Sequence, residues 1–94
     1  MTKEEQQRRL RAEHELHYLG NGPAATGGER GWNMSRELYF RCVQCDYLMQ
    51  ADPSTYDDCF CGAMYKDADA GRFGSQFGDS QIEVYRLVPK APVR

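Results

Sequence analysis

Four cysteines are the residues in this sequence whose type and spacing could do chemistry. They follow the pattern C-x2-C-x13-C-x-C, with Cys42 and Cys45 in "CVQC" and Cys59 and Cys61 in "CFC". Thiolates are preferred ligands of tetrahedral zinc, and four of them close its coordination sphere. The pattern therefore predicts a structural zinc site, with iron as the alternative metal because the same four thiolates bind either ion.

The second cysteine pair is one residue shorter than a usual zinc knuckle, and this leaves the ligand set open. Only Phe60 separates Cys59 from Cys61, although Gly62 remains where a positive φ would be useful. With this spacing, the backbone hydrogen bonds to the first sulfur must differ from those of a C-x-x-C loop. If one cysteine of the pair is not a ligand, the fourth position falls to His14, His17, Asp57 or Asp58. The histidines precede a glycine-rich segment, so the four-cysteine site is favoured.

Two other uses of clustered thiols fit this sequence less well. A disulfide framework is typical of secreted proteins. The opening "MTKEEQQRRLRAEHEL" has no apolar run that would serve as a secretion signal or a membrane span, so we expect a cytoplasmic protein with reduced thiols. A redox C-x-x-C needs a helix after its first cysteine, whereas "CVQCDYLMQ" has the pattern of a strand.

Short strands must position the cysteines. Alternating or apolar residues predict strands at 37–42, 46–50, 63–67 and 81–88, with the cysteine pairs at turns between them. Before them, a capping-box pattern at Thr2 and Glu5 predicts a polar helix over 2–19, and residues 20–31 predict a flexible glycine-rich linker. The narrow apolar stripe of the helix is typical of a solvated arm. The chain thus divides into a helical arm with its linker, residues 1–32, and a small, mainly β, metal-bound domain, residues 33–94.

The stretches "YFRCVQCDYLM" and "CFCGAMY" resemble a zinc ribbon of the rubredoxin-like group, over about residues 37–88. The resemblance implies two zinc knuckles on adjacent antiparallel hairpins that a small sheet joins. It implies no function, because ribbons of this kind serve transcription, translation, electron transfer and protein binding.

The segment "DADAGRFGSQFGD", residues 67–79, is the candidate partner-binding surface. A metal-held scaffold could present its acidic groups, one cation and two aromatic anchors to a partner. These candidate residues are Asp67, Asp69, Arg72, Phe73, Phe77 and Asp79. A plain strand connection, with the phenylalanines capping the core, would have the same composition. A calcium loop does not fit, because Gly71 and Gly78 stand where oxygen ligands are needed.

Charge separates the remaining function classes. The chain has 12 Lys and Arg against 14 Asp and Glu, a formal charge of −2. Residues 42–79 contain seven aspartates against one lysine and one arginine, a net of −5. This balance argues against nucleic acids and anionic membranes as partners and favours a basic protein surface. We therefore predict a non-enzymatic, zinc-stabilised protein-binding module, such as an inhibitor or immunity-type protein with an acidic face.

Other functions have weaker support. A nucleic-acid-associated ribbon is the alternative, based on Arg36, Arg41 and Arg86 together with Tyr39 and Phe40. A rubredoxin-type iron electron carrier is a further one. An enzyme is the least supported class, because four cysteines leave no open coordination position and residues 33–94 contain no histidine. The sequence indicates nothing about the oligomeric state.

Overall fold

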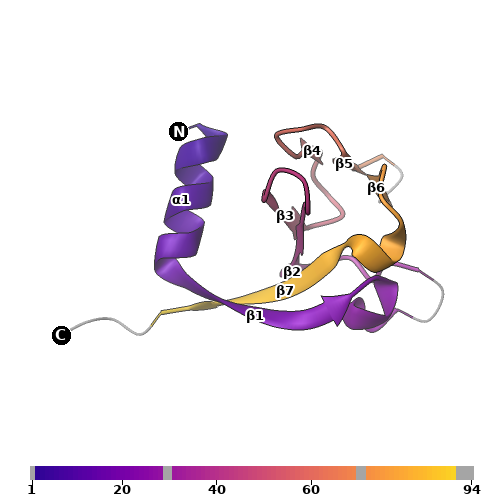
Figure 1. Ribbon diagram of the computed structural model, residues 1–94, viewed down its shortest axis with the longest axis horizontal. Coiled ribbons are helices and arrows are strands. Elements are labelled where there is room, and N and C mark those ends of the chain that lie inside the picture. The colour runs from indigo at the N-terminus through magenta and orange to yellow at the C-terminus, as the bar shows by residue number, and fades with distance from the viewer. Residues whose placement is uncertain (1, 29–30, 70–71, 91–94) are drawn as a thin grey trace.

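The computed structural model describes residues 2–28, 31–69 and 72–90, which form a mainly β protein with one N-terminal α-helix (Figure 1). Within these residues there are also two short 3₁₀ helices, η1 (Pro23–Thr26) and η2 (Asp79–Gln81). The helix is α1 (Lys3–Glu13), and the strands are β1 (His14–Asn21), β2 (Ser35–Arg41), β3 (Leu48–Ala51), β4 (Asp57–Asp58), β5 (Met64–Asp67), β6 (Arg72–Ser75) and β7 (Glu83–Pro89).

The strands form two antiparallel sheets. The larger sheet has the order β1-β7-β2-β3, and the smaller has the order β4-β5-β6. In the larger sheet β7 is central, since it pairs with β1 from His14↔Pro89 to Asn21↔Glu83 and with β2 from Leu38↔Arg86 to Arg41↔Glu83. Two hairpin turns, one between β2 and β3 and the other between β4 and β5, carry the cysteine pairs.

The core draws residues from both sheets. Phe40, Met49 and Val84 of the larger sheet and Met64 of the smaller one are fully buried. They belong to one cluster that also contains Cys42 and Cys59, so the cysteine turns lie where the two sheets meet. Along β2 the buried Leu38 and Phe40 alternate with the half-buried Tyr39 and Arg41, and this alternation explains why its sequence is recognisable as a strand.

The four strands predicted from the sequence are present, and their ends differ from the prediction by no more than two residues. Three strands were not predicted. They are β1, β4 of only two residues, and β6, which lies in the segment interpreted as a strand connection or recognition loop. β4 and β6 carry too few residues for a clear period, whereas the eight residues of β1 were interpreted as the end of the helix.

The helix predicted over residues 2–19 is wrong in its last six residues. Thr2 accepts a hydrogen bond from the Glu5 N–H, as the capping box predicts, but α1 ends at Glu13 and residues 14–21 form β1. Pairing along the whole of β7 gives this segment a ladder of backbone hydrogen bonds, and such tertiary pairing overrides helix propensity. The pairing of β1 with β7 therefore joins residues on both sides of the domain boundary that the sequence predicts near residue 33.

Part of the predicted flexible linker is ordered. Residues 23–26 form η1, and Thr26 is buried. The Thr26 hydroxyl donates to the Pro23 carbonyl at 2.5 Å and accepts from the Asn33 N–H at 2.9 Å. These bonds tie residues 23–26 to Asn33, which lies just before β2. Residues 29 and 30 lie outside the described part.

Candidate metal centre

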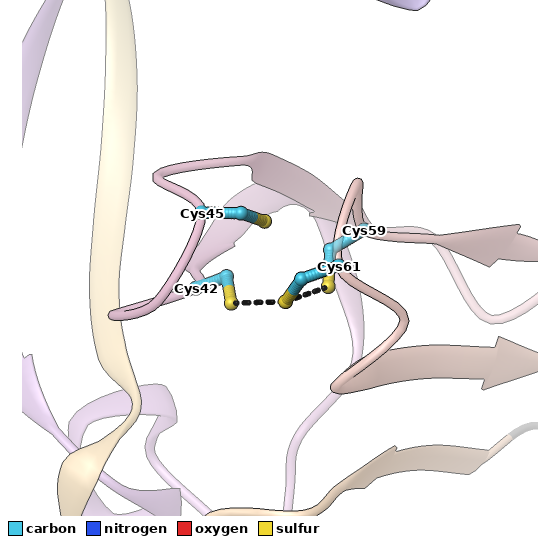
Figure 2. Close-up of side chains that lie close together, drawn as sticks. All are labelled: Cys42, Cys45, Cys59 and Cys61. Atoms are coloured by element: carbon cyan, nitrogen blue, oxygen red, sulfur yellow. Dashed lines mark hydrogen bonds between the residues drawn. The ribbon is translucent and has the colours of Figure 1, made fainter.

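The two hairpin turns bring the four cysteine sulfurs together (Figure 2). Cys42 and Cys45 come from the β2–β3 turn, Cys59 and Cys61 come from the β4–β5 turn, and all four Sγ atoms lie within 4.8 Å of one another. The Cys61 sulfur is 3.6 Å from that of Cys42 and 3.6 Å from that of Cys59. Around a zinc ion with bonds of about 2.3 Å, tetrahedral sulfurs would be about 3.8 Å apart. The cluster is therefore consistent with a metal-binding site.

The two cysteine turns have the same span. In the first, the Cys42 N–H donates to the Tyr47 carbonyl at 3.0 Å, and in the second, the Cys59 N–H donates to the Met64 carbonyl at 3.1 Å. Each closing hydrogen bond thus joins residues five positions apart. The second loop is therefore as long as the first, and only the position of its second cysteine differs. Cys61 comes two residues after Cys59, whereas Cys45 comes three residues after Cys42.

A residue with positive φ follows the second cysteine of each turn. Gly62 has φ 76°, as the sequence indicates, whereas Asp46 has φ 66° and is the only non-glycine residue of the described part in this region. A side chain disfavours this conformation, although aspartate tolerates it better than most residues. Two arginines contact Asp46: Arg41 at 2.5 Å and Arg11 at 3.1 Å. These ion pairs act against the strain that glycine avoids in the second turn.

The hydrogen bonds to the first sulfur differ between the turns, as the spacing predicts. Burial raises the pKa of the Cys42 thiol to about 12, and the backbone N–H groups of Cys45 and Gln44 act in the opposite sense. In the second turn the N–H of Met64 donates to the Cys59 sulfur at 3.2 Å. Donors to sulfur stabilise a thiolate, which is the form that binds a metal.

The cluster is buried on one side and open on the other. Cys42 and Cys59 are buried, Cys45 is half-buried and Cys61 is exposed. Burial acts to raise the pKa of Cys45, but N–H groups of Tyr47 and Cys61 outweigh it and lower that pKa to about 7. A metal ion would displace the protons that remain on these thiols. Four thiolates fit zinc or iron, and they would leave no coordination position for a substrate.

The alternative ligands lie outside this cluster. Within the described residues, the group of side chains close enough to hold a metal consists of the four cysteines. His14 Nδ1 lies 2.9 Å from the Leu10 carbonyl, and His17 lies beside Glu15 on β1. Asp57 accepts a hydrogen bond from the Tyr47 hydroxyl at 2.6 Å.

The acidic segment is partly neutralised by cations from elsewhere in the chain. Three of its seven aspartates form ion pairs with lysine or arginine residues of α1 and β2, which a charge count over residues 42–79 does not include. The pairs are Asp46 with Arg11 and Arg41, Asp52 with Arg36, and Asp57 with Lys3. Among the described residues, no ion-pair partner is found for Asp58, Asp67, Asp69 or Asp79.

The candidate partner-binding residues divide between the surface and the core. Asp67 and Arg72 face each other across the β5–β6 pair, both exposed, and the Asp67 carboxylate accepts the Asp69 N–H at 3.0 Å. Phe77 is half-buried and packs against the core, while Asp79 is exposed on η2. The structure therefore brings three of the polar candidates together and places Asp79 on another element.

Phe73 is not a free aromatic anchor. Its ring centroid lies 4.4 Å from that of Phe40 and 5.1 Å from that of Trp32. Trp32, Met34, Arg72 and Phe73 line a cavity of about 150 Å³. Trp32 and Met34 were missed from the sequence because they lie about 40 positions from Phe73 along the chain.

Comparison with known proteins gives no family for this chain. No protein-family model, curated protein sequence or solved structure matches it. In the part of the chain that the structure describes, no helix has the length and apolar composition needed to cross a membrane. The function that we propose therefore depends on the four-cysteine cluster and on the charges around it.

Proposed function

We propose that this protein is a non-enzymatic binding module of the zinc-ribbon type. In this proposal a structural Zn²⁺ bound by Cys42, Cys45, Cys59 and Cys61 fixes the two hairpins, and the surface around them binds a partner protein. The observation that carries the proposal is the convergence of four sulfurs within 4.8 Å from two separate hairpins. Iron is the alternative metal, because it accepts the same ligands.

A structural rather than catalytic role follows from the donor set. Four thiolates would complete a tetrahedral sphere, and a catalytic zinc needs an open position. The ion would also join two sheets in a chain of 94 residues, a size at which the core alone gives limited stability. We expect a cytoplasmic location, where thiols remain reduced.

A basic protein surface is the partner that the charges support. Asp58, Asp67 and Asp69 are exposed, near the second hairpin and the β5–β6 pair, and have no ion-pair partner among the described residues. An inhibitor or immunity-type protein that covers a basic site, such as that of a nuclease, would need this sign of charge.

Nucleic-acid binding has less support from the same contacts. Arg41 pairs with Asp46 and Glu83, Arg36 pairs with Asp52, and Arg86 lies 4.0 Å from Glu37. Their charges are therefore partly used within the protein. Phe40 is fully buried, so its ring is not available to stack on a base.

Metal analysis of the purified protein tests the centre. We expect one zinc per chain and a lower melting temperature after chelation. A red protein that contains iron would instead support the electron carrier. A protein without either metal, whose melting curve is unchanged by chelator, would contradict the metal centre.

Capture on the immobilised full-length protein tests the partner. We expect a basic protein to be retained at low ionic strength and released at about 0.5 M salt, where charges more than a few ångströms apart are screened. Asp67→Asn with Asp69→Asn should weaken retention. Glu15→Gln with Glu37→Gln removes the same charge from β1 and β2 and should not. Retention that salt does not affect would count against the acidic surface.

A further inference from the structure

Helix α1 contacts the rest of the protein through polar side chains on one face. Lys3, Gln7 and Arg11 are spaced four residues apart, so they lie in line along the helix. No residue of α1 is buried. Figure 1 shows the helix standing beside β3, at the outer edge of the four-stranded sheet. The helix is thus held by a polar stripe and not by an apolar face.

The middle residue of this stripe occupies the edge of β3. The Gln7 amide nitrogen donates to the Leu48 carbonyl at 2.9 Å, and the Leu48 N–H donates to Gln7 Oε1 at 2.8 Å. These are the two bonds that a neighbouring strand would form with Leu48. One side chain therefore takes the place of a peptide group at this edge.

The two ends of the stripe bind beside the two cysteine turns. Lys3 donates to the Asp58 carbonyl at 2.6 Å and lies 3.3 Å from the Asp57 carboxylate. Arg11 donates to the Asp46 carbonyl at 2.5 Å and lies 3.1 Å from its carboxylate. We call the surface of Asp46, Tyr47, Leu48, Asp57 and Asp58 the helix seat. Along this surface the carboxylate of Asp57, the edge of β3 at Leu48 and the carboxylate of Asp46 follow one another.

The helix does not fill this seat. A cavity of about 220 Å³, open to solvent on one side, lies between them. It is lined by Gln6, Gln7 and Leu10 of α1 and by Tyr39, Tyr47, Leu48, Gln50 and Asp57 of the domain. Protein interfaces that have been optimised for affinity are packed as densely as protein interiors. A helix with a larger apolar side chain in place of Leu10 would therefore complement the seat better than α1 does.

We propose that a basic helix of the partner protein occupies the helix seat by displacing α1, in addition to the contacts that the partner makes with the exposed Asp67 and Asp69. The partner helix has a cation, an amide and a cation four residues apart, with a bulky apolar residue at the place of Leu10. This inference rests on the proposed binding function and specifies its surface. Charge complementarity with Asp46 and Asp57 and the unfilled cavity select this occupant over an uncharged strand.

Displacement is physically accessible because α1 is weakly held. Exposed ion pairs contribute little, and a helix of 11 residues is marginally stable without packing. While α1 occupies the seat, it competes with the partner. The apparent affinity is then reduced by the fraction of molecules in which the seat is covered.

Two synthetic peptides probe the seat in the metal-loaded, full-length protein. One has the sequence of residues 2–13, and the other has Phe in place of Leu10. We expect the Phe peptide to bind more tightly, and to bind a Gln7→Ala/Arg11→Ala protein at least ~fivefold more tightly than the wild type, because α1 of this variant competes less. Glu4→Ala/Arg8→Ala, on exposed positions of α1 outside the stripe, is the control and should bind like the wild type.

A cavity-filling variant should have the opposite effect on peptide binding. Leu10→Phe in the protein itself should hold α1 in the seat and weaken peptide binding severalfold. In each titration, the amide signals of Leu48 and Gln50 should shift. Equal affinity of all four proteins, binding that leaves these signals unchanged, or no binding to any of them would overturn the proposal. A dimer of the wild-type protein in light scattering, lost in the Gln7→Ala/Arg11→Ala variant, would assign the seat to α1 of a second copy and also overturn it.

The two proposals fail separately. If the protein binds zinc and captures a basic partner but neither peptide occupies the seat, only this inference is wrong. If the peptides bind the seat but no cellular partner is captured, the binding function lacks support while the displacement of α1 stands.

Discussion

The two cysteine turns close over the same number of residues, yet the protein supports them differently. The turn at residues 42–47 joins β2 and β3 in the four-stranded sheet, and its positive-φ residue, Asp46, is paired with two arginines. The turn at residues 59–64 joins β5 to β4, a strand of two residues. Its positive-φ residue is Gly62, and its second cysteine, Cys61, is exposed.

This difference indicates how the stability of each half is divided between protein and metal. The first turn has a long sheet and side-chain ion pairs that maintain its shape. The second turn belongs to a small sheet, and its positive-φ residue is a glycine, which forms no side-chain ion pair, so its geometry depends more on bonds to a shared ion. We therefore expect the metal to organise chiefly the β4-β5-β6 sheet.

Removal of the metal should have the largest effect and should fall unevenly on the two sheets. Structural zinc binds small domains with about 10–16 kcal/mol of apparent free energy, so chelation should lower the melting temperature by more than about 10 °C. Hydrogen exchange should show loss of protection in β5 before β2 and β7. Equal loss in both sheets would mean that the turns depend on the metal equally.

Substitution of a buried cysteine should reduce the metal affinity more than substitution of an exposed cysteine. Cys42→Ser places a hydroxyl in a fully buried site, whereas water can replace the exposed thiol in Cys61→Ser. Burying an imperfectly bonded polar group costs about 1–3 kcal/mol, so Cys42→Ser should lose on the order of tenfold to a hundredfold more metal affinity. Competition with a chromophoric chelator measures both affinities, and a larger loss for Cys61→Ser would contradict the difference in burial.

Exchange of the two positive-φ residues should change the stability by different amounts. A Cβ added at Gly62 meets no atom within 4 Å, so Gly62→Ala costs only backbone strain, about 1–2 kcal/mol. Asp46→Gly relieves that strain but removes the ion pairs with Arg11 and Arg41, and the net change should be within about 1 kcal/mol. Urea unfolding of the metal-loaded proteins compares the two. If Asp46→Gly is the more destabilising, the arginines contribute more than the strain costs.

The smallest predicted effect on stability concerns Asp52, which lies in the segment between the two turns. Hydrogen bonds from the Ser54 hydroxyl and N–H, with the charges of Arg36 and Lys66, outweigh burial and hold the pKa of Asp52 below its usual value. A carboxyl with a lowered folded pKa adds stability that is complete above its unfolded pKa of about 3.9 and is lost as the pH falls through the folded pKa.

Substitution of Asp52 should therefore matter less in acid. Asp52→Asn should melt a few degrees below the wild type at neutral pH, and this difference should shrink as the pH falls below about 4. Since both proteins lose metal as the thiols protonate, the difference in melting temperature isolates the carboxyl. Asp79→Asn, at an exposed position on η2, is the control and should show no such trend. A difference that stays constant with pH would exclude the ionised Asp52 as its source.

Local patterns were sufficient for the parts of the site that lie within one hairpin. The spacing of the cysteines, the glycine after Cys61 and the alternation along 37–42 and 81–88 predict two turns on strands, and the structure has these features. The convergence of the two turns also follows, because four thiols at adjacent hairpin tips lie within reach of one ion. The interpretation of residues 14–19 as helix failed, because its strand partner is β7, about 70 residues later.

The sequence by itself determined which atoms could bind a metal and which short segments could present them, since both depend on spacings of a few residues. Only the tertiary structure decided the charge of the surface around them. Lys3 and Arg11 neutralise Asp57 and Asp46 across 54 and 35 positions of chain. It also packed the half-buried Phe73 against Trp32 and set Gln7 on the edge of β3. Such contacts leave no local period in the sequence, because they depend on where distant segments meet when the sheets form.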